Sequence, residues 1–175
     1  MQRPPILPRP CPEGGGRFVR LASPKVGSLV SGLVYSCRPL GFDTHWIGGR
    51  THPCLGTGPE CIGHAEGVPV RWKCYLFGRS DQTHGPVLFE IPKETYKQTL
   101  TLRDPGVSLR GAAIRLWRVG PNNNSPVGCQ IRVDVSPESC PVEEPDILAW
   151  LCVIWGCTDP REQVAATEGG RADEA

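Results

Sequence analysis

The segment from Arg38 to Pro69 constrains the fold most, because it is too irregular and too poor in apolar residues to pack by itself. It shows no sustained strand or helix period and is rich in glycine and proline. It also holds three of the four histidines and two of the nine cysteines of the chain. An irregular stretch of this length inside a compact domain needs something to hold it. We therefore expect a bound metal ion to organise this segment.

The window THWIGGRTHPCLGTGPECIGH supplies the candidate metal ligands. Cys61 and His64 are separated by two residues, a spacing that lets one short turn aim both side chains at one point. Cys54 precedes them across a glycine- and proline-containing loop. His45 or His52 can complete the set, and His45 is preferred because His52 is only two residues from Cys54. Thiolate and imidazole donors in a closed four-ligand site are typical of structural zinc.

Other interpretations of this window remain open from the residues alone. The histidines can be exposed and the thiols free, with no metal bound. A catalytic zinc would need an open coordination position and a general base, for which Glu60 and Glu66 are available. The odd number of cysteines favours reduced thiols in a cytoplasmic protein over a disulfide framework.

The remainder of the chain predicts a mainly β domain over residues 17–156. Residues 1–16 are rich in proline and glycine and are expected to form a disordered leader without a signal sequence. Strands are expected in 18–21, 29–36, 71–77, 86–91, 112–119 and 129–135. Short helices are expected after Pro92 and over 143–156, and residues 157–175 are expected to form a flexible acidic tail. No apolar run is long enough to cross a membrane.

Cationic and aromatic residues alternate along the predicted strands. In RWKCYLF, the face that carries Arg71 is expected to be cationic and aromatic, and the opposite face carries Trp72. Single-stranded nucleic acid requires this mixture, because bases stack on rings while cations meet phosphates. The alternative interpretation is that the aromatic rings are buried in the core and the cations lie on a solvent-exposed surface of the sheet. The candidate nucleic-acid-binding residues are Arg71, Lys73, Tyr75, Phe77, Arg115, Trp117 and Arg132.

The charge distribution agrees with an anion-binding body. Residues 1–132 contain 17 Lys and Arg against 8 Asp and Glu, a balance of +9, whereas residues 133–175 contain 2 against 10, a balance of −8. A basic body suits a polyanionic partner, and an acidic end can recruit other proteins. Replication or repair proteins are the partners we expect for the tail. Ordinary solubility charge is the alternative.

The order of these elements resembles a five-stranded OB barrel with a zinc-knuckle insertion and a C-terminal helix. It is similar to the zinc-containing single-stranded DNA-binding (helix-destabilising) proteins of T4-type phages, over residues 30–135. In that family a His and three Cys hold zinc, followed by strand, turn, strand and helix. The residues and segments that carry the resemblance are His45, Cys54, Cys61 and His64, then RWKCYLFG, GPVLFEIPKETYKQTL and RGAAIRLWRVG. The final ligand here is His, the ligand gaps are shorter and no basic cooperativity motif is present, so the resemblance does not extend to cooperative polymerisation.

Taken together, the sequence predicts a non-enzymatic module that binds single-stranded nucleic acid, DNA by resemblance. Two alternatives belong to other classes. A zinc-binding protein-interaction module would use the apolar segment Ile147–Trp155 to dock on a partner. A metal-dependent hydrolase or nuclease would need a carboxylate-rich constellation, which the sequence lacks.

Overall fold

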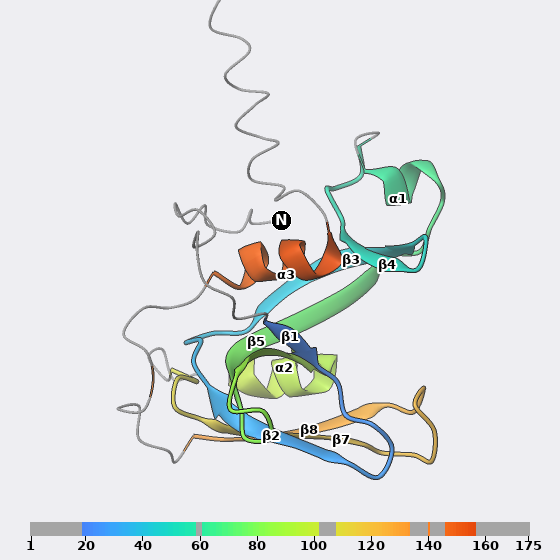
Figure 1. The fold of residues 1–175 in the computed structure, drawn as a ribbon. Coiled ribbons are helices and arrows are strands. Elements are labelled where there is room, and N and C mark those ends of the chain that lie inside the picture. The colour runs from blue at the N-terminus through green and yellow to red at the C-terminus, as the bar shows by residue number, and fades with distance from the viewer. Residues whose placement is uncertain (1–18, 59–60, 102–107, 134–139, 141–145, 157–175) are drawn as a thin grey trace, which may run out of the picture. The chain divides into compact units, whose positions relative to one another are not determined.

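The computed structural model describes residues 19–58, 61–101, 108–133, 140 and 146–156, and these are mainly β (Figure 1). The predicted leader and acidic tail lie outside the described residues. Within the described residues no helix is long and apolar enough to cross a membrane. The elements are β1 Arg20–Ala22, β2 Leu29–Val34, β3 Leu40–Ile47, β4 Arg50–Pro53, α1 Ile62–Ala65, β5 Arg71–Ser80, β6 Pro86–Ile91, α2 Lys93–Thr101, β7 Ala113–Arg118, β8 Val127–Arg132 and α3 Ile147–Trp155.

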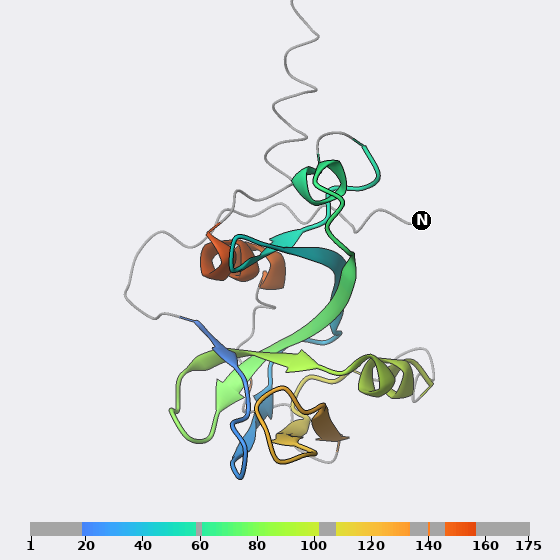
Figure 2. The same cartoon turned by 90° about the vertical axis from the view of Figure 1, so that its right-hand side faces the viewer.

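The chain divides into two compact units, which we call the hairpin unit and the sheet unit. The described part of the hairpin unit comprises 43–58, 61–71 and 148–156. The described part of the sheet unit comprises 19–42, 72–101, 108–133, 140 and 146–147. Within the hairpin unit, α3 lies beside the β3–β4 hairpin in both Figure 1 and Figure 2.

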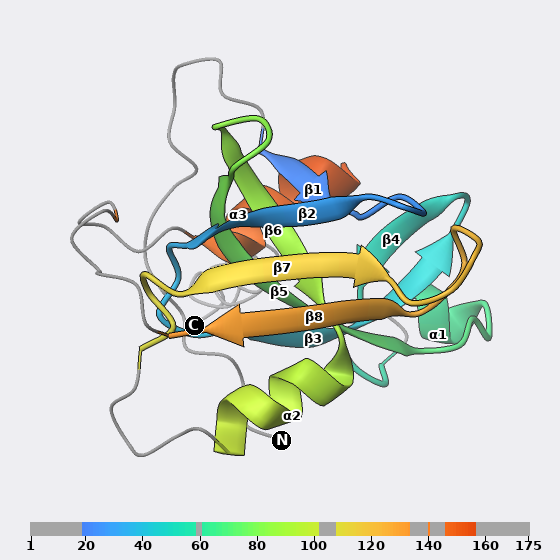
Figure 3. The same cartoon turned by 90° about the horizontal axis from the view of Figure 1, so that it is seen from below.

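The strands form one mixed sheet in the order β1-β6-β5-β2-β7-β8, and β3 pairs with both β4 and β5. The short β1 runs parallel to β6. The pairs β2–β5, β2–β7, β3–β4, β5–β6 and β7–β8 are antiparallel. Figure 3 shows β2, β7 and β8 side by side. Among the described strands β8 pairs with β7 alone, so the sheet is open and the expected closed barrel is not observed.

The segment 38–69, which we expected to be irregular, contains regular structure. Residues 40–53 form the β3–β4 hairpin, and residues 62–65 form α1. The hairpin turns at Gly48 and Gly49, which both have positive φ, at 56° and 80°. A two-residue turn with positive φ at both positions matches the twist of the strands that it joins. The expectation of an irregular segment was wrong because β3 and β4 are too polar to show the alternation of apolar and polar residues that marks a strand. The Gly48–Gly49 pair was the available signal for a hairpin.

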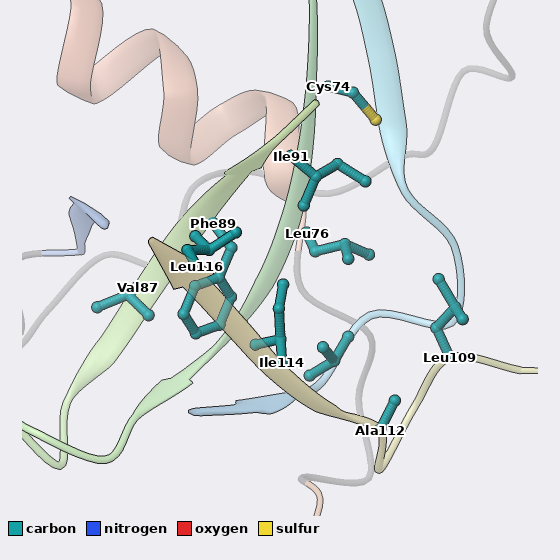
Figure 4. Packing of buried hydrophobic residues seen from close by; sticks show 10 residues of the cluster. Cys74, Leu76, Val87, Phe89, Ile91, Leu109, Ala112, Ile114 and Leu116 are labelled. Atoms are coloured by element: carbon teal, nitrogen blue, oxygen red, sulfur yellow. The ribbon is translucent and has the colours of Figure 1, made fainter. Parts of the chain in front are cut away.

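The core of the sheet unit lies on one face of β2, β5, β6 and β7. Figure 4 shows Leu76, Phe89, Ile114 and Leu116 pointing toward one another, and all four are at most 1% exposed. The ring of Phe89 packs against two glycines, Gly32 on β2 and Gly78 on β5. A Cβ at either position would overlap this ring. Such interdigitation at interior packing density is what burial of apolar area requires.

Candidate functional site

The β3–β4 hairpin and α1 position the predicted metal ligands. His45 lies on β3, and its direct partner in the register is His52 on β4. The Cys54 N–H donates to the Asp43 carbonyl at 2.9 Å, which continues the pairing beyond β4. Because directly opposed residues share a face, this register places His45 and Cys54 on the same side of the hairpin.

The second pair of ligands comes from the start of α1. Cys61 is the N-cap residue of α1, and its carbonyl accepts the Ala65 N–H at 3.0 Å. His64 follows three residues later, so the two side chains lie on neighbouring positions of one helical turn. The Cys-x2-His spacing therefore acts as predicted, with a helical turn in place of an irregular one.

The four side chains meet at one point. One ligand atom from each of His45, Cys54, Cys61 and His64 lies within 4.8 Å of all the others. The Cys61 Sγ is 3.4 Å from the His45 Nε2, and the Cys54 Sγ is 3.8 Å from the His64 Nδ1. The rings of the two histidines meet edge to face, with centroids 4.9 Å apart. The predicted set of four residues thus forms a group that can hold a metal ion.

The site has a buried half and a more open half. His45 and Cys61 are each 1% exposed, whereas Cys54 and His64 are only partly buried. The Nδ1 of His45 is 3.0 Å from the carbonyl oxygen of Val68. A carbonyl can only accept a hydrogen bond, so Nδ1 carries the proton and Nε2 is left as the electron-pair donor toward the cluster.

The packing around His45 also requires a glycine. A Cβ on Gly63 would overlap the His45 ring, so α1 approaches β3 this closely only because position 63 has no side chain. The imidazole of His45 is therefore contacted both by the Val68 carbonyl and by Gly63. The contact with Gly63 was not anticipated from the sequence, in which Gly63 is one of many glycines.

The pKa values of the Cys54 and Cys61 thiols are shifted in opposite directions. Burial alone would raise the pKa of Cys61, but hydrogen bonds from the His64 side chain and from nearby backbone outweigh burial and lower the pKa to about 6. Burial raises the pKa of the Cys54 thiol. A thiolate is the metal-binding form of cysteine, so Cys61 is the thiol already prepared to bind.

Three other residues of this region lie outside the cluster. His52 shares the hairpin face with His45 but is not part of the four-residue group, so the choice of His45 agrees with the geometry. Trp46 alternates to the opposite face from the cluster and is 52% exposed, so it does not pack over the metal ligands. Glu66 is the C-cap of α1 and is exposed, and Glu60 lies outside the described residues.

The predicted base-stacking roles of Tyr75 and Phe77 are corrected by their burial. Tyr75 is 0% exposed and Phe77 is 8% exposed, so neither ring is open to a ligand. Phe42 lies against Tyr75 with ring centroids 5.8 Å apart, and Tyr35 lies 6.3 Å from Phe77. Strand β5 is buried on both faces from 74 to 78, which local alternation cannot reveal.

The cations of β5 are also separated from those of β7. Lys73 is paired with Glu90, at 3.2 Å between Nζ and Oε2, so its charge is largely neutralised within the sheet. Arg71 is exposed but belongs to the hairpin unit. Strand β2 lies between β5 and β7, so the cations of these two strands are not on adjacent strands.

The three remaining predicted residues do share one open face of the sheet unit. Arg115 and Trp117 point away from the core side that holds Ile114 and Leu116, and both are exposed. In the register, Arg132 on β8 opposes Ala113 on β7, so it shares their face. We call this side of β2, β7 and β8 the outer face; its residues are Leu29, Ser31, Leu33, Ala113, Arg115, Trp117, Gly128, Gln130 and Arg132. Leu33, at the β2 end of its row, is buried.

One cation that the sequence analysis missed borders the outer face. Arg79 on β5 opposes Leu33 on β2 and is exposed. It therefore extends the row formed by Leu33, Ala113 and Arg132. The signal was available, because extending the alternation of β5 by two residues beyond Phe77 reaches Arg79.

Arg118 plays a different part, because it alternates away from the outer face. Its guanidinium donates to the Pro24 carbonyl at 3.0 Å and to the Ser125 carbonyl at 2.7 Å. These hydrogen bonds connect the β7–β8 turn to the segment before β2. We therefore assign Arg118 a structural role.

Comparison with protein-family models, with curated proteins and with solved structures gives no match. The fold and the site therefore define the class directly: a mainly β protein with a four-residue His/Cys group that can hold a metal ion.

Proposed function

We propose that the His/Cys cluster is a structural zinc site. Tetrahedral zinc with Zn–S of about 2.3 Å and Zn–N of about 2.0 to 2.1 Å holds a sulfur and a nitrogen ligand about 3.6 Å apart. Two of the four sulfur–nitrogen separations in the cluster, 3.4 and 3.8 Å, lie on either side of that value. Two thiolates also balance the charge of Zn²⁺, which favours burial of half of the site. Four protein ligands leave no open position for catalysis.

Metal analysis of the purified protein tests the zinc assignment. We expect one zinc per chain in the wild type and less than a tenth of that in Cys61→Ser. Cys37→Ser is the matched control, because Cys37 is a partly buried cysteine that does not belong to the cluster, and this variant should retain full zinc. Full zinc content in Cys61→Ser would remove the assignment.

We further propose that the sheet is OB-like. The strands β6, β5, β2, β7 and β8 lie in that order, and α2 connects β6 to β7. In chain order this is the arrangement 3-2-1-4-5 with a helix between the third and fourth strands, as in an OB fold opened between its third and fifth strands. The hairpin and α1 occupy the connection between the first and second of these strands. OB folds serve as platforms for oligonucleotides.

We propose that this module binds single-stranded nucleic acid and performs no chemistry of its own. The observation that carries the proposal is the outer face, where Arg115, Trp117 and Arg132 are exposed together and Arg79 borders the same surface. Guanidinium groups bind phosphates, and an exposed indole offers a surface to an unpaired base. Such binding is non-specific, because both contacts are common to all sequences.

Fluorescence anisotropy of a labelled oligonucleotide at several salt concentrations tests this function. Three neutralised phosphates predict a log–log salt slope of roughly −2, because each contributes about −0.7 on a single strand. Arg115→Gln and Arg132→Gln should each weaken binding and make the slope shallower by about 0.7. Lys97→Gln, which removes an exposed cation on α2, is the control and should leave binding unchanged. Absence of binding by the wild type at low salt would end this proposal.

A further inference from the structure

Trp117 lies flat against the neighbouring strand because position 128 is glycine. A Cβ on Gly128 would lie 2.6 Å from the Nε1 and 2.7 Å from the Cζ2 of the indole, much closer than van der Waals contact. Gly128 is the direct partner of Trp117 in the β7–β8 register. One face of the indole therefore rests on the backbone of β8, and the side chain as a whole is still 37% exposed.

The opposite neighbour of Trp117 is also apolar and open. Leu29 on β2 pairs directly with Trp117 and is 49% exposed. Leu29, Trp117 and Gly128 thus form one row across three strands, which we call the shelf. An apolar row left in water on a sheet surface is a site where a flat apolar ligand gains contact area.

The next row of the outer face is polar and cationic, and the third row combines the apolar Leu33 and Ala113 with Arg132 at its β8 end. Arg115 lies two residues from Trp117 along β7, a separation of about 7 Å, with Ser31 and Gln130 on either side of it. The third row ends with Arg132 on β8 and is extended by Arg79 on β5. An apolar shelf is therefore followed along the strands by charges that suit phosphates.

We infer that the shelf takes one unpaired base, stacked on the free face of Trp117, with Gly128 as the residue that positions the indole. This inference rests on the proposed nucleic-acid function and specifies its ligand. In a duplex the faces of the bases are stacked on one another and only their edges are accessible in the grooves. The indole of Trp117 therefore cannot stack on a base inside a duplex. Only a single strand can place a base on the shelf while its phosphates reach Arg115 and Arg132.

The test separates the base from the phosphates with two labelled probes of equal length and charge. One is a twelve-residue oligothymidylate, and the other is the same deoxyribose-phosphate backbone without bases. We expect the wild type to bind the first about tenfold more tightly, in keeping with the usual contribution of one stacked base. Trp117→Ala and Gly128→Ala should bind both probes equally and should keep the wild-type affinity for the abasic probe. Trp117→Phe, which retains a ring, should restore part of the preference.

The control is Gly85→Ala, because a Cβ at Gly85 meets nothing closer than 3.8 Å. It should keep the full preference. Circular dichroism and zinc content establish that each variant is folded, and the Trp117 variants decide the matter if Gly128→Ala does not fold. A retained preference in Trp117→Ala, or equal binding of both probes by the wild type, overturns the shelf while leaving the cationic face intact. Failure of the wild type to bind either probe removes the nucleic-acid function as well.

Discussion

At the scale of single residues, the geometry of the His/Cys cluster depends on groups that are not themselves candidate ligands. The Val68 carbonyl fixes which nitrogen of His45 faces the cluster, and Gly63 leaves room for that ring. Outer contacts of this kind orient ligands and commonly affect metal affinity strongly. The four candidate ligands were predictable from residue type and spacing. The Val68 carbonyl and Gly63 were not, since neither group carries a metal-binding signal in a sequence.

Gly63→Ala tests the support beneath His45. The new Cβ would displace the imidazole or α1, and overpacking of a buried site costs about 1 to 3 kcal/mol. We expect a lower melting temperature and weaker zinc retention in competition with a chelator. Gly85→Ala is again the control, because that position has space. Equal zinc retention in both variants would contradict the role of Gly63.

The pH dependence of the metal-free protein tests the electrostatics of Cys61. Its pKa is lowered to about 6 in the folded chain, below the value of about 8.5 for an unperturbed thiol. The stabilisation from its thiolate is therefore complete above the unfolded pKa and is lost as the pH falls through about 6. We expect the free energy of unfolding without metal to rise more between pH 6 and 9 in the wild type than in Cys61→Ser. Parallel pH profiles for the two proteins would contradict this.

At the scale of elements, β5 shows why the pattern of one strand is insufficient. Its alternation predicted a cationic and aromatic face, yet Phe42 and Tyr35, which come from other segments, cover Tyr75 and Phe77. Burial and the neighbouring Glu90 carboxylate also raise the pKa of Tyr75 well above its usual range. By contrast β7, which has an exposed face, kept its predicted arrangement. Whether a strand has one covered face or two is decided by its neighbours.

Removal of a negative charge, that of Asp81, provides a second test of the outer face. Its backbone N–H donates to the Ser31 carbonyl at 2.9 Å, so this carboxylate stands at the β5 margin of the outer face. A carboxylate there repels phosphates. Asp81→Asn should tighten oligonucleotide binding about twofold to fivefold at low salt, and the gain should fade as salt increases. Weaker binding, measured by anisotropy, would show that nucleic acid does not approach this margin.

At the scale of the whole molecule, the hairpin unit and the sheet unit are stabilised by different means. The sheet unit has an apolar cluster that includes Leu76, Phe89 and Ile114. The described part of the hairpin unit holds the His/Cys cluster and a few buried apolar residues of α3, such as Leu151 and Trp155. Other large apolar side chains of this unit remain exposed, among them Trp46 at 52% and Ile62 at 61%. Where a core is small, metal coordination can supply the folding free energy instead.

Removal of the metal should therefore act locally. With a chelator present, we expect backbone amides of residues 43–58 and 61–71 to lose protection in hydrogen exchange, whereas those of β2, β6 and β7 remain protected. Exchange mass spectrometry on fragments from the two regions measures this. Uniform loss of protection in both regions would show instead that the metal supports the entire fold.

The sequence by itself predicted the His/Cys group that can hold a metal ion, the mainly β character and the position of most strands. Those properties depend on the chemistry of donor atoms and on short-range alternation, which neighbouring residues along the chain carry. The tertiary structure alone decided that β5 is buried on both faces, that β2 separates β5 from β7, and that Trp117 rests on Gly128. These depend on which distant segments pair and cover one another, and the free energy of that choice belongs to packing between segments and to no single stretch of the chain.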